Sequence, residues 1–234
     1  MTAADLVIVG AGGFARETAA AVRAINEVRP TWRVLGFLDD DPALHGTTRA
    51  GVPILRGLDA VVESPDAAVV VCVGNPRDYA ARERVVRRLD LPAHRYATLV
   101  HPSAAVAPDS LIGPGSVLLA HAVLTAAVTV GAHVAVMPHA VLTHDDAVGE
   151  YATLASGVRL GGSVTVARGA YLGAGALIRE SVHIGEWSLV GMGSVVLNDV
   201  PAGQVWAGNP ARFLRHINLP AQPHAGATQG SSQQ

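Results

Sequence analysis

The second half of the chain repeats an aliphatic residue at every sixth position. In steps of six from residue 100 to residue 196, all seventeen positions hold valine, leucine or isoleucine. This period is neither the 3.6-residue period of a helix nor the two-residue alternation of an ordinary strand. It is typical of a parallel β-helix, in which each hexad points one aliphatic side chain inward. The seventeen positions are Val100, Val106, Ile112, Leu118, Leu124, Val130, Val136, Leu142, Val148, Leu154, Leu160, Val166, Leu172, Ile178, Ile184, Val190 and Val196.

Small residues accompany the aliphatic ones at fixed places in the hexad. Alanine or serine usually stands two residues before, as at Ala140 and Ala152, and glycine often follows directly, as at Gly131 and Gly161. We expect the small side chain to fit beside the aliphatic one and the glycine to permit a tight corner. Seventeen hexads, three to a triangular coil, predict between five and six coils that end at Pro201 and Gly203.

The first third of the chain has a different pattern. Apolar runs at residues 6–9, 34–38 and 69–73 predict three strands. A helix is predicted from the glycine-rich segment to about residue 26, and another over residues 77–89. Strands that alternate with helices indicate a small Rossmann-like α/β unit, truncated because the hexads begin near Val100.

The glycine-rich segment at residues 10–15 matches G-x-G-x-x-G/A at a turn from strand to helix. Backbone amides at such a turn favour a phosphate, although the glycines can also serve only to pack helix on strand. Too few strands precede the hexads for a full NAD-binding domain, so we expect a diphosphate rather than a redox cofactor. Ligands bind where parallel strands end, and the candidate substrate-binding residues are Gly12, Gly13, Phe14, Asp39, Asp40, Gly74 and Asn75.

Composition excludes several classes of function. The formal net charge is −2 and half of the residues are hydrophobic, so we expect neither nucleic-acid nor membrane binding. The basic stretch at residues 82–88 is interrupted by Glu83, and we interpret it as a solvated helix face. The single cysteine, Cys72, allows no intrachain disulfide. With no signal-peptide pattern at the N-terminus, this predicts a cytoplasmic protein.

The chain resembles the hexapeptide-repeat sugar acyltransferases of the sialic-acid and bacillosamine type, over roughly residues 5–215. This family includes N-acetyltransferases that act on nucleotide-linked amino sugars. The resemblance rests on seven short segments that are specific only together. They are VGAGG at 9–13, FLDD at 37–40, VGN at 73–75, HPS at 101–103, HD at 144–145, GGSV at 161–164 and GNPAR at 208–212.

The resemblance implies a left-handed β-helix, a homotrimer, and acetyl-CoA bound in the groove between neighbouring subunits, without a metal. His144 would act as general base beside Asp145, and the N-terminal lobe would hold the nucleotide sugar. The expected contacts to acetyl-CoA are Thr153, Gly162, Ala174 and Met192.

The patterns and the resemblance together divide the chain into four parts. We expect a nucleotide-sugar-binding lobe at 1–98 and a β-helix acyltransferase domain at 99–200. A C-terminal segment at 201–217 would pack on the coils, and a disordered tail would follow at 218–234.

The sequence departs from the family at three places. Thr153 replaces a histidine that lies near the thioester in some members, and Met137 replaces an asparagine often found before the catalytic turn. These two changes bear on the acyl donor. Phe14 replaces a histidine in the glycine loop, which bears on the sugar site.

The proposed chemistry is direct acyl transfer. The neutral sugar amine would attack the thioester carbonyl, His144 would take the proton, and a backbone amide near Gly162 would hold the oxyanion. Histidine suits this role because an imidazole titrates near neutral pH. Asp145 and Asp146 both remain candidates for the group that orients the ring. Without the family match, an exposed corner histidine is the simpler interpretation of His144.

Three other functions stay open from the sequence. His144 would serve O-acylation of a sugar hydroxyl equally well. A γ-type carbonic-anhydrase-like zinc enzyme is suggested by His139 and His144, but the third ligand position falls on Ser103. A trimeric nucleotide-binding scaffold without catalysis is the third.

His121 and His139, which are one coil apart in the repeat, are expected to stack as an exposed ladder rather than to bind metal. The nucleotide, the sugar, the acyl chain length and the pathway cannot be read from the sequence.

Overall fold

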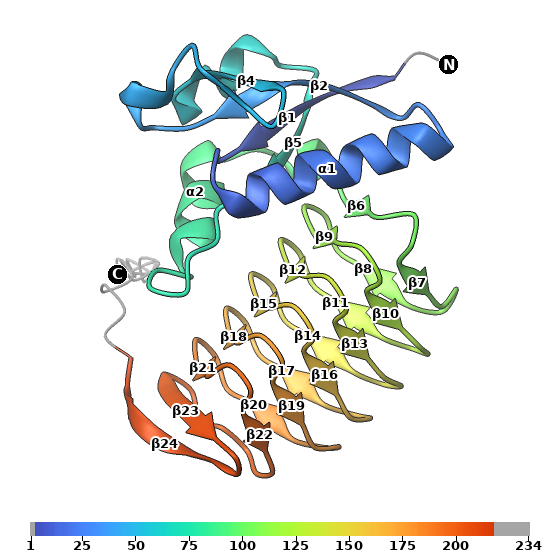
Figure 1. Ribbon diagram of the computed structural model, residues 1–234, viewed down its shortest axis with the longest axis vertical. Coiled ribbons are helices and arrows are strands. Elements are labelled where there is room, and N and C mark those ends of the chain that lie inside the picture. Colours follow the sequence, from blue (N-terminus) through green and yellow to red (C-terminus); the bar gives the residue numbers. More distant parts are fainter. Residues whose placement is uncertain (1–2, 218–234) are drawn as a thin grey trace, which may run out of the picture.

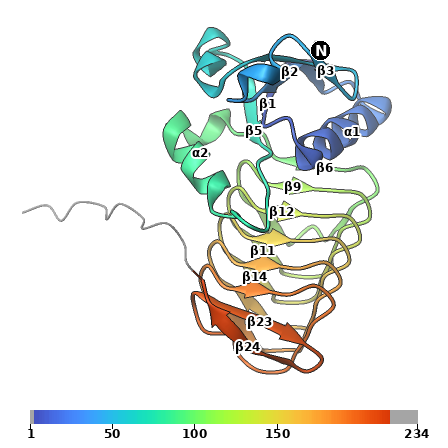
Figure 2. The same ribbon diagram turned by 60° about the vertical axis from the view of Figure 1, so that its left-hand side comes forward.

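The computed structural model describes residues 3–217, which form an α/β lobe at one end of a stack of β coils (Figure 1). The predicted tail at 218–234 lies outside the described residues. Figure 2 shows that the lobe covers the first coils and that one of its helices, α2, runs down beside the stack.

The lobe is built on a five-stranded sheet with the order β3-β4-β2-β1-β5. All neighbours are parallel except β3, which is antiparallel to β4. The three predicted strands are present, but β3 and β4 were not predicted because one has two residues and the other contains Pro53. The strands are β1 (Ala4–Val9), β2 (Trp32–Leu38), β3 (Thr48–Arg49), β4 (Val52–Arg56) and β5 (Ala68–Val71).

Alternate residues of β1 face two separate cores. Leu6 and Ile8 pack in the core that includes α1 (Gly13–Val28) and the first coils, whereas Val7 and Val9 pack in the core beneath α2 (Ala81–Leu89). The second helix begins at Ala81, four residues after the predicted start at residue 77. The preceding segment is a turn, because the Asn75 side chain accepts from the Arg77 amide. Three 3₁₀ turns complete the lobe: Pro42–Leu44, Leu58–Glu63 and Ala93–Arg95.

The coils confirm the hexad repeat. Each hexad supplies one two-residue strand, and each strand pairs in parallel with the strand three positions along the chain, so three sheets form the sides of the coil. The strands are β6 (Leu99–Val100), β7 (Ala105–Val106), β8 (Leu111–Ile112), β9 (Val117–Leu118), β10 (Val123–Leu124), β11 (Thr129–Val130), β12 (Ala135–Val136), β13 (Val141–Leu142), β14 (Ala147–Val148), β15 (Thr153–Leu154), β16 (Arg159–Leu160), β17 (Thr165–Val166), β18 (Tyr171–Leu172), β19 (Leu177–Ile178), β20 (His183–Ile184), β21 (Leu189–Val190) and β22 (Val195–Val196).

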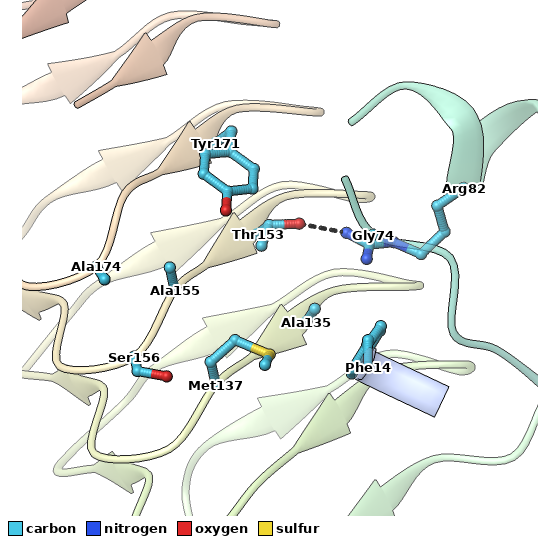
Figure 3. Close-up of a pocket in the computed structure, with 10 residues that line it drawn as sticks. All are labelled: Phe14, Gly74, Arg82, Ala135, Met137, Thr153, Ala155, Ser156, Tyr171 and Ala174. Carbon is cyan, nitrogen blue, oxygen red and sulfur yellow. Dashed lines mark hydrogen bonds between the residues drawn. The ribbon is translucent and has the colours of Figure 1, made fainter. Parts of the chain in front are cut away.

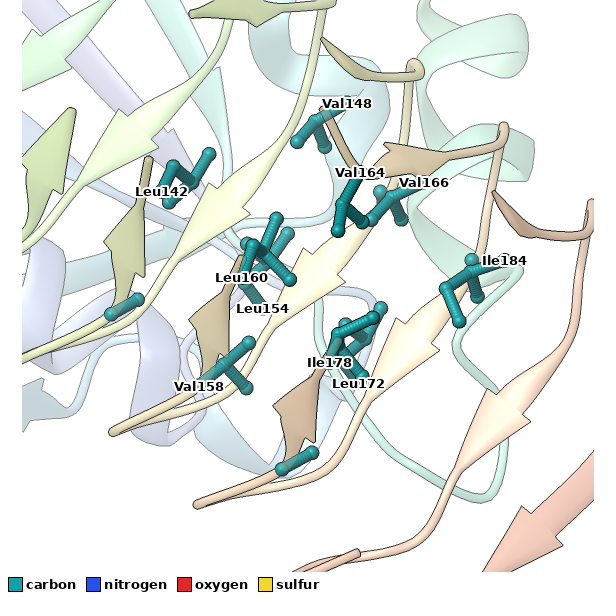
Figure 4. Packing of buried hydrophobic residues seen from close by; sticks show 14 of the residues in the cluster. Leu142, Val148, Leu154, Val158, Leu160, Val164, Val166, Leu172, Ile178 and Ile184 are labelled. Carbon is teal, nitrogen blue, oxygen red and sulfur yellow. The ribbon is translucent and has the colours of Figure 1, made fainter. Parts of the chain in front are cut away.

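The second residue of each strand points into the coil. Figure 4 shows these side chains stacked in the interior, where Leu142, Leu154 and Leu172 are fully buried. The small residues stand beside them as expected, with Ala140 and Ala152 also fully buried. Burial of this continuous apolar column stabilises the stack, at about 25 cal/mol for each Å² of apolar surface removed from water.

The glycines that follow the aliphatic residues have a different role from the predicted one. They are not at the corners, which are formed by residues with positive φ such as His133, Asp145 and Ser163. Instead, a Cβ at Gly131 would lie 2.8 Å from the backbone nitrogen of Glu150 in the next coil. Glycine is therefore required by the close approach of successive coils rather than by a left-handed turn.

A hairpin follows the last hexad. Its first strand, β23 (Gln204–Gly208), pairs in parallel with β21, and β24 (Ala211–His216) returns antiparallel to it. The sheet thus continues past Pro201 and Gly203, where the hexad pattern ends, because strand pairing does not require a side-chain repeat.

Candidate functional site

The glycine loop of the lobe keeps donors free at the start of α1. Gly12 caps the helix without a side-chain hydrogen bond, and both Gly12 and Gly13 are exposed. The Asp39 carboxylate accepts from the Ala11 amide at 2.9 Å, so the end of β2 and the loop meet as predicted. The first N–H groups of a helix have no intrahelical partner, and this arrangement favours an anion.

Two other predicted substrate residues already have intramolecular partners. Asp40 accepts from the Leu58 amide at 3.0 Å and pairs with Arg88. The amide hydrogen bond and the guanidinium hold the pKa of Asp40 below its usual value. The Asn75 side chain shapes the turn before α2 and is exposed. Both residues therefore organise the lobe, whatever else they contact.

The N-terminal end of α2 docks onto the coils, contrary to the predicted solvated face. Arg82 and Glu83 are each 2% exposed. Glu83 pairs with Arg168 at 2.8 Å, and Tyr79 donates to the carbonyl of Trp187 at 2.8 Å. The sequence held a signal for this, because Arg82 continues the helical stripe formed by Val85, Val86 and Leu89.

A pocket lies where this end of α2, the glycine loop and the coils meet (Figure 3). Its volume is about 500 Å³, part of it open to solvent. Four predicted site residues, two from the lobe and two from the coils, converge here although they are distant in sequence. The lining consists of Phe14, Gly74, Arg82, Ala135, Met137, Thr153, Ala155, Ser156, Tyr171 and Ala174.

A second group of candidate residues lies at an exposed corner of the coils. His144 follows β13, and the side chains of His144 and Asp145 are 65% and 62% exposed. Asp145 has a φ of +62°, and its carboxylate turns back to lie 2.9 Å from Nδ1 of His144. A carboxylate can only accept, so Nδ1 carries the hydrogen, and in the neutral imidazole Nε2 keeps its lone pair.

Asp146 points the other way and is 1% exposed. Its two oxygens accept from the backbone amides of Thr143 and Val164, at 2.7 and 2.8 Å. Burial raises the pKa of Asp146 to about 6, even though both amides favour the ionised form. The structure therefore gives Asp145, and not Asp146, the contact with the imidazole.

Gly162 stands next to the His144 ring, one coil further on. A Cβ at Gly162 would overlap Nε2 and Cε1 of His144, so only glycine leaves the ring in its place. Among the described residues, the Gly162 amide donates no hydrogen bond. The lone pair of Nε2 and a free backbone donor thus lie close together.

The pocket and the His144 corner lie on different faces of the coil. Thr153 and Tyr171 belong to the sheet that runs from β6 to β24, whereas His144 follows a strand of the sheet that runs from β7 to β22. The predicted acetyl-CoA contacts are split accordingly, with Gly162 beside His144 and with Thr153 and Ala174 in the pocket. Met192 is 78% exposed and stacks one coil beyond Ala174 at the edge of the pocket face.

Three further histidines and the cysteine pack against other parts of the protein. His121 and His139 stack as predicted, with ring centroids 5.0 Å apart. His133 is buried between Tyr96 and Tyr151, and burial lowers its pKa to about 4. Cys72 is buried, and burial raises the pKa of its thiol to about 12.

Within residues 3–217, no group of three or more histidine, cysteine, aspartate or glutamate side chains is placed to hold a metal ion. Over the same part of the chain, neither α1 nor α2 is long and apolar enough to span a membrane.

Fold and site together define a hexapeptide-repeat transferase, with a glycine-loop lobe, an exposed histidine–carboxylate corner and a pocket between lobe and coils. Residues 5–89 match the PglD N-terminal domain family. Over 121 residues the chain is 33% identical to UDP-N-acetylbacillosamine N-acetyltransferase of Bacillus subtilis (strain 168). That match covers 50% of this chain, which spans about half the length, 51%, of this curated relative.

Solved structures match over most of the chain. The acetyltransferase domain of PglB from Neisseria gonorrhoeae FA1090, in complex with acetyl coenzyme A, is 28% identical with a TM-score of 0.81, over 91% of this chain and 100% of that one. A histidine-to-asparagine mutant of perosamine N-acetyltransferase from Caulobacter crescentus, with CoA and GDP-perosamine, is 28% identical with a TM-score of 0.79, over 90% and 97%. WeeI from Acinetobacter baumannii AYE is 30% identical with a TM-score of 0.77, over 89% and 99%. Over most of its length the chain is thus similar to sugar N-acetyltransferases of known structure.

Proposed function

We propose that this chain is an acetyl-CoA-dependent N-acetyltransferase that acts on the amine of a nucleotide-linked amino sugar. The observation that carries the proposal is the His144 corner, where Nδ1 meets Asp145 at 2.9 Å and Nε2 keeps its lone pair beside Gly162. A general base, an orienting carboxylate and a backbone donor are the groups that acyl transfer to an amine requires. The relatives with bound acetyl coenzyme A, CoA and GDP-perosamine support the substrate class.

In the proposed reaction, His144 accepts the proton that the amine loses as its nitrogen attacks the acyl carbonyl carbon. Asp145 stabilises the imidazolium that results. The Gly162 amide donates to the oxygen of the tetrahedral intermediate. The C–N bond forms, the C–S bond breaks, and His144 returns the proton to the departing thiolate.

The residues at the pocket face fit a pantetheine thioester. Ser156, Ala174 and Met192 follow one another at intervals of one coil, so they stack at one edge of successive coils; the first two line the pocket, and Met192 is exposed beyond it. The glycine loop at the start of α1 suits the sugar diphosphate. A cytoplasmic location remains a prediction.

We also propose that the active enzyme is a homotrimer with sites between subunits. Within one chain the His144 corner and the pocket lie on different faces of the coils. A trimer would bring the His144 corner of one subunit to the pocket of its neighbour. Exposed apolar side chains along the coils, such as Leu111 and Met192, support such contacts.

The test is a thiol-release assay with acetyl-CoA and a panel of UDP-, GDP- and dTDP-linked sugars that carry either an amine or only hydroxyls. Wild type should release CoA with an amino sugar, and His144→Ala should lower the rate by about 10²–10⁴-fold while its melting temperature is unchanged. His183→Ala, another exposed histidine on the coils, is the matched control and should keep full activity. Thiol release with hydroxyl-only sugars alone would instead indicate O-acylation, and no release with any sugar would refute the substrate class.

A further inference from the structure

Arg82 is a buried cation without a carboxylate partner among the described residues. The two hydrogens of its Nη2 are shared among three acceptors: the carbonyls of Tyr151 and Ala152, at 2.9 and 3.1 Å, and Oγ1 of Thr153 at 2.7 Å. Nη1 lies 3.4 Å from the carbonyl of Val73, and Nε has no partner. Burial lowers the pKa of Arg82 to about 10, so the guanidinium stays charged at neutral pH. Burying a charge is costly, and the hydrogen bonds from Nη1 and Nη2 offset part of that cost.

The contacts of Arg82 join the two walls of the pocket. Val73 precedes Gly74 in the lobe wall, and Thr153 belongs to the coil wall (Figure 3). A guanidinium has no acceptor, so it occupies a lone pair of the Thr153 oxygen and forces the hydroxyl hydrogen to point elsewhere. Among the described residues the Thr153 hydroxyl donates no hydrogen bond, and Thr153 lines the pocket, so its hydrogen is available to a ligand there. The charged donor also polarises the hydroxyl and strengthens it as a donor.

We propose that Arg82 is a positioning residue that fixes the Thr153 hydroxyl as a hydrogen-bond donor to the carbonyl oxygen of the acyl donor. The lining of the pocket favours this ligand. Six of its ten lining residues are apolar or glycine, and its polar side chains can all act as donors: Arg82, Thr153, Ser156 and Tyr171. A short alkyl group with one carbonyl oxygen matches such a surface, whereas a sugar ring would leave several hydroxyls unpaired.

This inference rests on the proposed function, because it assumes an acyl thioester at the pocket. Its test uses calorimetry to compare how two ligands bind to the whole 234-residue chain. The ligands are acetyl-CoA and S-ethyl-CoA, in which a methylene group replaces the carbonyl. Wild type should bind acetyl-CoA about five to tenfold more tightly, as one hydrogen bond of about 1 kcal/mol requires. Thr153→Val and Arg82→Met should both lose this preference, and Thr153→Ser should retain it.

The ratio of the two affinities distinguishes positioning from a structural role, because a loosened pocket would weaken both ligands alike. Arg84→Met removes an exposed arginine from the same helix and should keep the wild-type ratio. If Arg82→Met does not fold, Arg82→Lys replaces it, and its preference should also fall because lysine lacks the planar fork. A wild-type ratio near one, or a ratio unchanged in Thr153→Val or in the Arg82 variant that folds, would overturn the inference alone. Wild type that binds neither ligand would overturn the proposed function with it.

Discussion

His144, at the exposed corner, and Arg82, in the pocket between lobe and coils, are held in place by different kinds of contact. His144 is exposed, and its position comes from residues of the repeat itself: the adjacent Asp145 in a left-handed corner, and the bare Gly162 one coil away. Arg82 is buried, and its partners Tyr151, Ala152 and Thr153 lie far away in the sequence, on the coils. A repeat can thus present a reactive group through local geometry, whereas a pocket wall between two domains needs long-range contacts.

The largest expected effect comes from Gly162→Ala, which attacks the local geometry of the corner. The new methyl group would overlap the His144 ring, and the ring would swing toward solvent because it is exposed. We expect kcat in the thiol-release assay to fall at least 100-fold, or about 2.7 kcal/mol, with little change in melting temperature. On a His144→Ala background the same substitution should have no further effect. Full activity in Gly162→Ala would show that the ring position is not required.

The second effect separates the two neighbouring carboxylates. Asp146→Ala would leave the buried amides of Thr143 and Val164 unpaired. We expect the free energy of unfolding, measured by urea denaturation, to fall by about 2 kcal/mol. Asp145→Ala is the matched control and should cost less than about 0.5 kcal/mol because its carboxylate is exposed. Equal losses would contradict the inward role of Asp146.

A third prediction concerns how the buried His133 makes the stability of the protein depend on pH. The pKa of His133 is about 4 in the folded protein against an ordinary value of 6.5, so the unfolded chain takes up a proton first as the pH falls between these values. Stability therefore falls with pH in this window. When the pH is lowered from 7 to 5, the free energy of unfolding, measured by urea denaturation, should fall less in His133→Phe than in wild type. The difference between the two losses should be about 1–2 kcal/mol.

Asp146 acts in the opposite direction, because its raised pKa of about 6 favours the folded state as the pH falls toward 3.8. The comparison between His133→Phe and wild type cancels this contribution, since Asp146 is the same in both. Parallel stability–pH curves from pH 7 to pH 5 would refute the assignment to His133.

The smallest expected effect is that of Asp145→Asn. An amide keeps the size of the carboxylate but stabilises an imidazolium poorly, so we expect kcat to fall about fivefold, or about 1 kcal/mol. Asp109→Asn, at another exposed position of the coils, is the control and should match wild type in the same assay. If both variants are equally active, Asp145 does not assist His144.

The hexad pattern allowed the coils to be predicted strand by strand, because each aliphatic position stacks on the one that lies three hexads along the chain. The family resemblance led to His144 and Asp145, and their contact needs only adjacent residues. The role of the glycines was misassigned, since close stacking of coils and a left-handed corner favour the same residue type.

The sequence by itself determined the period of the coils and the strand–glycine–helix order of the lobe, because these depend on residues close in sequence or in repeat register. The candidate base came from the family resemblance. Only the tertiary structure decided that Asp145 faces the imidazole while Asp146 is buried, since adjacent side chains diverge at a corner whose conformation the residue types leave open. It also decided that Arg82 and Glu83 turn inward. The apolar stripe of α2 includes Arg82, but a charged residue on a helix is ordinarily solvated. Nothing local to α2 reveals which carbonyls and which arginine of the coils receive these two side chains.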